Sequence, residues 1–178
     1  MSAKQFIDAN TLNHDSFLLA RQIFDSGFRP DAIIVLWRGG SLVGMAVQEF
    51  LAFKGITPYH TIVKTSAYQD IDQRSQVSVE NMDHVLANLN QNSQVLLVDD
   101  IFDTGSTMAA VKQILEQTTR KIKIATIFYK PTRSLVDFAP DFYLHQTDSW
   151  LVLPHELLGL TPTEIAQKDP FLATLTNK

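Results

Sequence analysis

Cysteine is absent from the 178-residue sequence, which excludes disulfide bonds, thiolate nucleophiles and thiolate metal ligands. Long apolar stretches are also missing, and none approaches the roughly 20 residues that a membrane-spanning helix needs. The sequence begins without the basic and then apolar segments of a secretory signal, so we expect a cytoplasmic protein without an integral membrane span. A net charge of −4 argues against general binding to nucleic acid.

Neither repeats nor linkers interrupt the sequence, and its length and 45% hydrophobic content suit one domain over residues 1–178. Apolar patterns predict helices that alternate with strands. The helices are expected at 12–26, 42–54, 81–90 and 106–117, and the strands at 32–37, 59–63, 94–98 and 122–128. The polar segment 65–79 is expected to be a loop, and the chain from residue 130 onward is expected to be irregular.

Strands that alternate with helices predict an α/β fold, in which helices flank a central parallel sheet. In such sheets, ligands bind beyond the carboxyl ends of the strands. Three unusual segments follow strands at that end: one begins at Arg38, one is the polar segment 65–79, and one begins at Asp100. The sequence therefore predicts that these segments contribute to one ligand-binding site.

The stretch VLLVDDIFDTGSTM, residues 95–108, runs from an apolar strand through three acids into Thr-Gly-Ser-Thr. Free N–H groups and the helix dipole at the following helix start favour an anion. Gly105 lets the backbone curl around the anion, and the hydroxyls of Ser106 and Thr107 add hydrogen-bond donors. A phosphate monoester fits such a cradle. The acids cannot bind phosphate, so we expect sugar hydroxyls, Mg²⁺ or a protonated ring nitrogen as their partners.

Simpler interpretations of this stretch exist. Asp103 or Ser106 could merely cap the helix, although the apolar run, three acids and two hydroxyls together favour a ligand site. The Gly-Lys-Ser/Thr of the P-loop and the glycine triplet of dinucleotide folds are missing. Asp100 and Asp103 lie three residues apart, whereas an aspartate-nucleophile phosphatase would have acids two apart. Asp99 and Asp100 are strand neighbours that point to opposite faces, so we do not expect them to chelate one metal together.

A strand that ends in two acids, followed by a short spacer and Asp-Thr-Gly-Ser-Thr, resembles the PRPP-binding motif of type I phosphoribosyltransferases. Trp-Arg-Gly-Gly at 37–40 resembles the pyrophosphate-binding loop of this family. The segments that resemble xanthine-guanine phosphoribosyltransferase are Ser66-Ala67-Tyr68 with Gln73-Arg74, then Ile127 to Pro131, then Asp148 to Leu151 with Pro154. The resemblance spans about residues 33–156. It departs at His155, where another aromatic is expected, and in a longer stretch at 81–92.

The resemblance implies roles on the PRPP side of the site. The 5′-phosphate would be held by Thr104, Gly105, Ser106 and Thr107. The ribose hydroxyls would be bound by Asp99 and Asp100, with Asp100 beside Mg²⁺. Pyrophosphate would be met by Arg38 and Gly39, and by Arg74 as its loop closes.

The resemblance also implies roles on the base side. Asp103 would exchange a proton at purine N7, and Lys130 would contact the 6-oxo group. Trp150 would stack on the base, and the Leu151 backbone would meet its 2-side.

The activity implied by the resemblance is purine salvage. The ribosyl 5-phosphate of PRPP would be transferred to guanine, xanthine or hypoxanthine, giving the nucleoside monophosphate and pyrophosphate with Mg²⁺ as cofactor. A homo-oligomer and a small hood over about residues 130–178 are implied as well. Two alternatives stay open. One is a phosphoribosyltransferase for a pyrimidine base, which Lys130 and Trp150 disfavour. The other is a PRPP-sensing regulatory protein, which the acidic balance disfavours.

Overall fold

The computed structural model describes residues 4–69 and 75–176. The described chain forms two compact units. Residues 13–148 make the larger unit, and residues 4–12 with 149–176 make the smaller one. Within the described ranges, no helix is both long and apolar enough to cross a membrane.

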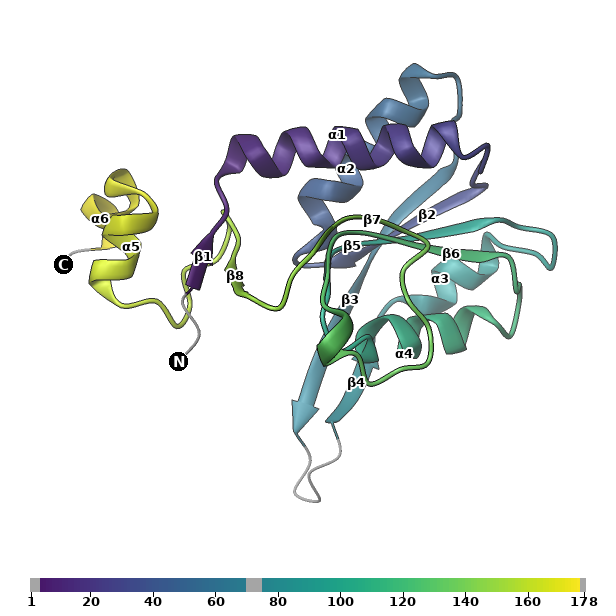
Figure 1. The fold of residues 1–178 in the computed structure, drawn as a ribbon. Helices are drawn as coiled ribbons and strands as arrows, with labels where there is room; N and C mark the ends of the chain where they lie inside the picture. The colour runs from purple at the N-terminus through teal and green to yellow at the C-terminus, as the bar shows by residue number, and fades with distance from the viewer. Residues whose placement is uncertain (1–3, 70–74, 177–178) are drawn as a thin grey trace. The chain divides into compact units, whose positions relative to one another are not determined.

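The larger unit is built on a six-stranded sheet in the order β4-β3-β2-β5-β6-β7 (Figure 1). All neighbouring strands are parallel except the antiparallel pair of β3 and β4. The strands are β2 (Ala32–Trp37), β3 (Tyr59–Gln69), β4 (Ser75–Val79), β5 (Val95–Phe102), β6 (Ile122–Tyr129) and β7 (Phe142–Gln146). The helices are α1 (Ala9–Asp25), which begins in the smaller unit, α2 (Gly40–Phe53), α3 (Met82–Ala87) and α4 (Ser106–Leu115). These elements confirm the predicted α/β fold.

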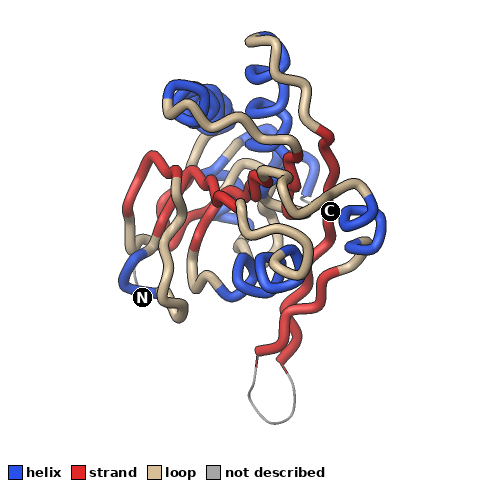
Figure 2. The backbone as a smooth tube through the Cα atoms, turned by 90° about the vertical axis from the view of Figure 1, so that its right-hand side faces the viewer, coloured by secondary structure: helices blue, strands red, loops and turns tan. Residues whose placement is uncertain are grey.

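Helices cover both faces of the sheet (Figures 1 and 2). On one face, Ile34 of β2 is buried in a cluster with Val85 of α3 and Val111 of α4. On the other face, β2 lies so close to α2 that a Cβ on Gly44 would be 2.3 Å from Cγ2 of Val35. A strand that is buried on both faces needs a continuous apolar run, which explains why this part of the sheet was predictable.

Each helix and strand that the sequence predicts between residues 12 and 128 is found, the strand at 32–37 with the predicted bounds and the others with shifted ends. The strand predicted at 94–98 continues to Phe102, so both Asp99 and Asp100 lie within β5. The predicted loop at 65–79 is wrong for residues 65–69 and 75–79, which form a hairpin with Thr65 opposite Val79. Backbone hydrogen bonds hold such a hairpin together without an apolar face. The middle of the predicted loop, 70–74, lies outside the described residues.

The prediction of an irregular chain after residue 130 is also wrong. A 3-10 turn, Pro131–Arg133, and strand β7 belong to the larger unit. In the smaller unit, β1 (Lys4–Phe6) pairs in parallel with β8 (Trp150–Val152), and two short helices follow, α5 (Pro162–Lys168) and α6 (Pro170–Thr176). Short elements of this kind depend on pairing between distant residues and on helix caps, which apolar periodicity does not reveal.

Candidate active site

The carboxyl ends of β2, β5 and β6 lie side by side in the sheet. Val35 of β2 is in register with Val98 of β5, and Val98 is in register with Ala125 of β6. Because all three strands are parallel, the residues that follow them meet at one edge. Arg38 follows β2, Asp99 and Asp100 lie near the end of β5, and Lys130 follows β6. The fold thus brings together segments that are far apart in the sequence.

The loop after β2 lies directly against the acid pair of β5. Its Trp37–Arg38 peptide bond is cis. A Cβ on Gly39 would lie 2.1 Å from Oδ2 of Asp100, so glycine permits this approach without displacement of the carboxylate. The N–H of Gly40 donates to the Asp99 carboxylate. Arg38 is exposed beside these contacts.

Asp99 and Asp100 form a costly pair of neighbouring carboxylates. The N–H of Asp100 donates to Oδ1 of Asp99 at 2.9 Å, and the N–H of Ile101 donates to Oδ1 of Asp100 at 2.7 Å. Burial, and then repulsion from Asp100, raise the pKa of Asp99 well above its usual range. A site with this electrostatic character gains from a ligand that brings positive charge or hydroxyl donors.

The segment between β5 and α4 surrounds a small cavity of about 70 Å³. The cavity is lined by Asp99, Ile101, Phe102, Asp103, Thr104, Gly105, Thr107 and Met108. Gly105 precedes α4 with a positive φ of 77°, and the first helical N–H, that of Ser106, donates to Oγ1 of Thr104 at 3.3 Å and not to Asp103. The interpretation of Asp103 or Ser106 as a simple helix cap therefore loses its support. The Thr104 hydroxyl donates to Oγ of Ser106 at 3.1 Å, so two hydroxyl groups lie together at the start of a helix.

Asp103 lies between two cations. Its Oδ2 is 3.6 Å from Nζ of Lys130, a residue with only 4% of its surface exposed, and its Oδ1 is 2.6 Å from Nε of Arg133. The Arg133 contact is an ion pair without hydrogen-bond geometry, and Oδ1 has no hydrogen-bond partner within the described residues. Sequence reasoning found Asp103 and Lys130 but missed Arg133. The signal that could have revealed Arg133 is Pro131. This proline begins a single 3-10 turn, Pro131–Arg133, which brings Arg133 back to the site.

The other predicted site residues lie in the smaller unit or outside the described residues. Trp150 and Leu151 lie on β8 of the smaller unit, Trp150 half exposed and Leu151 buried. Arg74 lies outside the described residues. The roles predicted for these three residues stay predictions.

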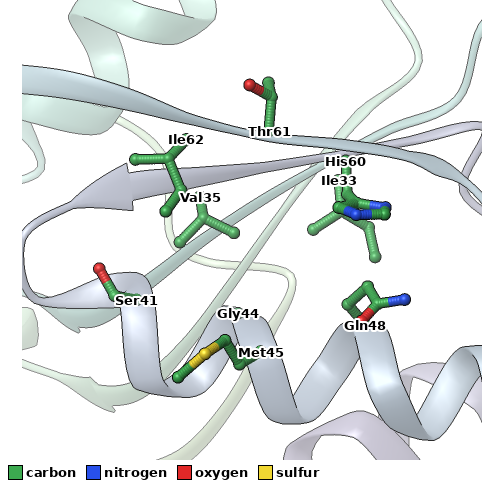
Figure 3. Close-up of a pocket in the computed structure, with 9 residues that line it drawn as sticks. All are labelled: Ile33, Val35, Ser41, Gly44, Met45, Gln48, His60, Thr61 and Ile62. Carbon is green, nitrogen blue, oxygen red and sulfur yellow. The ribbon is translucent and has the colours of Figure 1, made fainter.

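A larger cavity of about 220 Å³ lies elsewhere, between α2 and strands β2 and β3 (Figure 3). Its lining is mostly apolar, with Met45 of α2 and Ile62 of β3 both substantially exposed. None of the predicted site residues lines it, and it holds no acid, lysine or arginine. The smaller cavity, with its acids and hydroxyls, is therefore the better candidate for chemistry on a charged substrate.

A divalent cation fits the acid pair only together with a substrate. Within the described ranges, no cluster of three or more metal-ligating side chains is present. Mg²⁺ commonly takes one or two carboxylates and completes its shell with water and substrate phosphates. Asp100 could supply that protein share.

Comparison with known proteins matches residues 9–155 to the phosphoribosyl transferase domain family. Hypoxanthine-guanine phosphoribosyltransferase of Lactococcus lactis is 32% identical over 84 residues, which cover 46% of this chain and 43% of that protein. The corresponding protein of Staphylococcus epidermidis is matched over 62% of its length at 24% identity. Xanthine-guanine phosphoribosyltransferase of Chromohalobacter salexigens is 27% identical over 82% of this chain and 80% of that protein.

Solved structures agree with this assignment. A purine phosphoribosyltransferase from Pyrococcus horikoshii superposes with a TM-score of 0.73 at 25% identity, covering 89% of this chain and 97% of that one. A hypothetical protein from Neisseria gonorrhoeae, solved with bound ppGpp, superposes with a TM-score of 0.76 at 20% identity over 99% of both chains. Because the family match spans most of the chain and includes the acid and hydroxyl segment after β5, this protein belongs to the type I phosphoribosyltransferase family.

Proposed function

We propose that this protein is a purine phosphoribosyltransferase, which joins a 6-oxopurine to the ribosyl 5-phosphate of PRPP and releases pyrophosphate. The observation that carries the proposal is the pairing of Asp103 with the buried Lys130 beside the hydroxyl-rich start of α4. A 6-oxopurine presents N7 and O6 side by side as neighbouring polar atoms. An acid and a lysine 3.6 Å apart match that pair. The names of the Lactococcus, Chromohalobacter and Pyrococcus relatives support the same substrate class.

In this proposal the PRPP phosphate and ribose occupy the edge of the sheet formed by β5 and α4. The N–H groups and hydroxyls of residues 104–107 hold the 5′-phosphate, since a helix start favours an anion. Asp99 and Asp100 accept hydrogen bonds from the ribose hydroxyls, and Asp100 is the ligand assigned to Mg²⁺. When bound, Mg²⁺ would supply positive charge to the pyrophosphate oxygens.

The displacement at ribose C1 requires stabilisation of two developing charges. The sugar gains oxocarbenium character as its bond to pyrophosphate lengthens, and pyrophosphate gains negative charge. In this proposal Arg38 donates to phosphate oxygens with its planar fork, and Gly39 contacts the pyrophosphate. Ionised Asp103 takes the proton that the purine loses. Arg74 is assigned to the pyrophosphate side when its segment closes.

The base side of the proposal has three further assignments. Lys130 donates to the 6-oxo oxygen, Trp150 stacks on the ring, and the Leu151 backbone meets the 2-substituent. A single functional domain, a cytoplasmic location and assembly into a homo-oligomer stay predictions.

A panel of bases tests the proposal directly. The protein is incubated with PRPP and Mg²⁺ and, in separate reactions, with guanine, xanthine, hypoxanthine, uracil and orotate, and the products are identified by mass. We expect a purine nucleoside monophosphate and pyrophosphate, and loss of product when EDTA removes the metal. Product only with a pyrimidine would support the pyrimidine alternative. PRPP binding by calorimetry without turnover of any base would support the regulatory alternative, and either result would overturn the proposal.

A further inference from the structure

Arg133 is the cation closest to Asp103, and it is not part of the roles assigned above. Its Nε lies 2.6 Å from Oδ1, whereas Nζ of Lys130 lies 3.6 Å from Oδ2. Charge-assisted N–H···O hydrogen bonds are about 2.7–2.9 Å long. Lys130 is therefore held beyond hydrogen-bond distance from an acid next to which it is buried, and Arg133 takes up the other oxygen of that acid.

The 130–136 segment, which carries Arg133, is fastened to the segment between β5 and α4 at both ends. The N–H of Lys130 donates to the Phe102 carbonyl at 2.9 Å, and the N–H of Leu135 donates to the Thr104 carbonyl, also at 2.9 Å. Between these bonds, the N–H of Arg133 donates to the Lys130 carbonyl at 3.1 Å and closes the turn. These contacts hold the backbone of Arg133 beside Asp103, and its side chain, which is 48% exposed, reaches Oδ1 from there.

Removal of Arg133 would change the balance between the two remaining charges. Oδ1 of Asp103 is a buried atom with no hydrogen-bond partner in the described chain. Without Arg133, Oδ1 would have neither a cation nor a hydrogen-bond partner among the described residues, and Lys130 would be the only described cation left beside the carboxylate, whose side chain is 38% exposed. The carboxylate could turn toward Lys130 and form a direct ion pair. Both groups would then be bound to each other instead of to a base.

We propose that Arg133 is a positioning residue that holds the Asp103 carboxylate away from Lys130, so that the acid and the lysine each remain available to the purine. The inference rests on the proposed function, because it assigns Arg133 to the base half of that same site. Its effect should appear with the base and in turnover, and PRPP affinity should be left unchanged. A direct contact between Arg133 and a PRPP phosphate would produce the opposite pattern.

The test compares wild type with Arg133→Gln, Arg133→Lys, Asp103→Asn and the double variant Asp103→Asn/Arg133→Gln. Arg21→Gln is the matched control, since Arg21 is an exposed arginine paired at 3.3 Å with Asp25 on α1, away from the sheet edge. Steady-state constants for purine and PRPP are measured for each protein, with single-turnover assays at high protein concentration for the slow ones. Thermal unfolding identifies any variant that fails to fold.

We expect Arg133→Gln to lower kcat by about tenfold or more, because small displacements of a catalytic group are expensive. Its KM for the purine should rise, and its KM for PRPP should match wild type. Arg133→Lys, which restores a cation, should recover part of the loss. In the Asp103→Asn background, the second substitution should cause little further loss, since Arg133 acts through the carboxylate.

Three results would overturn the inference. The first is a kcat within twofold of wild type in folded Arg133→Gln or, if that variant does not fold, full activity with Arg133→Lys and no change in its purine KM. The second is a raised KM for PRPP alone. The third is full additivity in the double variant. Absence of turnover in wild type itself would instead reject the proposed function, so the two failures are distinguishable.

Discussion

Two acids in this molecule, one in each compact unit, lie in opposite electrostatic environments. Burial and the neighbouring Asp100 raise the pKa of Asp99, at the sheet edge of the larger unit, well above its usual range. At the start of α5 in the smaller unit, hydrogen bonds from Lys4 and then from the Thr161 N–H lower the pKa of Glu164 from 4.5 to about 2. The first acid destabilises its surroundings when ionised, and the second stabilises them.

The difference separates a site built for a ligand from a site built for folding. Glu164 belongs to a complete capping box, in which its carboxylate accepts from the Thr161 N–H and the Thr161 hydroxyl accepts from the Glu164 N–H. The Glu164 carboxylate thus finds its hydrogen-bond donors within the chain. Asp99 and Asp100 repel each other, and the backbone hydrogen bonds that Asp99 accepts do not offset the rise in its pKa. Groups whose pKa is strongly perturbed by burial and a neighbouring like charge, as that of Asp99 is, concentrate at functional sites.

The largest expected effect lies at the larger unit's sheet edge. Asp103→Asn keeps the shape of the side chain but cannot accept the purine proton, so turnover should fall by roughly 10²–10⁴-fold. PRPP affinity, measured by calorimetry, should be essentially unchanged. Asp31→Asn is a matched control at the amino end of β2, where Asp31 accepts from the Gln94 N–H at 2.8 Å, and it should leave turnover intact. Equal losses in both variants would contradict the assignment of Asp103.

Two glycines with nearly equal backbone angles sharpen the contrast between the units. Gly105 has a φ of +77°, and a Cβ there would lie 2.5 Å from Val136 and 2.8 Å from the Phe102 ring, whereas Gly159 has a φ of +80° with nothing within 4 Å. Gly159→Ala should cost about 1–2 kcal/mol for the left-handed backbone alone. Gly105→Ala should cost a further 1–3 kcal/mol or so from overpacking. Chemical unfolding measures both, and equal costs would mean that the space around Gly105 relaxes freely.

Replacement of Asp99, whose ionisation in the folded protein is costly, should raise stability and lower turnover. A carboxyl whose pKa is raised by folding costs stability above its unfolded pKa, and this cost grows as the pH rises toward the folded pKa. Asp99→Asn removes the cost, so the free energy of unfolding at pH 7 should increase by on the order of 1 kcal/mol. Thermal unfolding between pH 4 and 8 should show a flatter profile than wild type, and turnover should drop. A destabilised Asp99→Asn protein would mean that Asp99 is ionised at little cost.

The smallest effect is expected at the start of α5. Because the folded pKa of Glu164 is lowered, its contribution is fully present above about pH 4.5 and is lost as the pH falls toward 2. The hydrogen-exchange protection factors of residues 162–168 should therefore fall over that range in wild type, and Glu164→Gln should remove this pH dependence. Thr161→Ala should weaken the helix by about 1 kcal/mol at any pH. If these protection factors did not change with pH in wild type, the Lys4 contact would not stabilise the ionised form of Glu164.

Much of the fold and of the acid cluster could be predicted because short-range patterns determine them. The apolar run of β2 indicates a buried strand, and the apolar residues before Asp99 do the same for β5. Once both are parallel strands, their carboxyl ends must meet. The approach of Gly39 to Asp100, which was not predicted, follows from that topology.

The rest depends on contacts that no local pattern encodes. Arg133 reaches Asp103 only because the chain returns to Phe102 and Thr104 after β6. The pairing of β1 with β8 joins Lys4 to Trp150 across most of the chain. The β3–β4 hairpin was mistaken for a loop because its strands are polar, and the prediction relied on apolar periodicity. In each case the stabilising partner is distant, or is the backbone itself.

The double attachment of residues 130–136 has a consequence for how this scaffold can diversify. Since Lys130 and Leu135 are tied to carbonyls on either side of Asp103, the number of residues between them is constrained. An insertion would detach one end and misalign both cations. We therefore expect the preferred base to vary through substitution of side chains within a segment of constant length. Relatives with an altered preference should keep the number of residues between positions 130 and 135 and differ in the residues themselves.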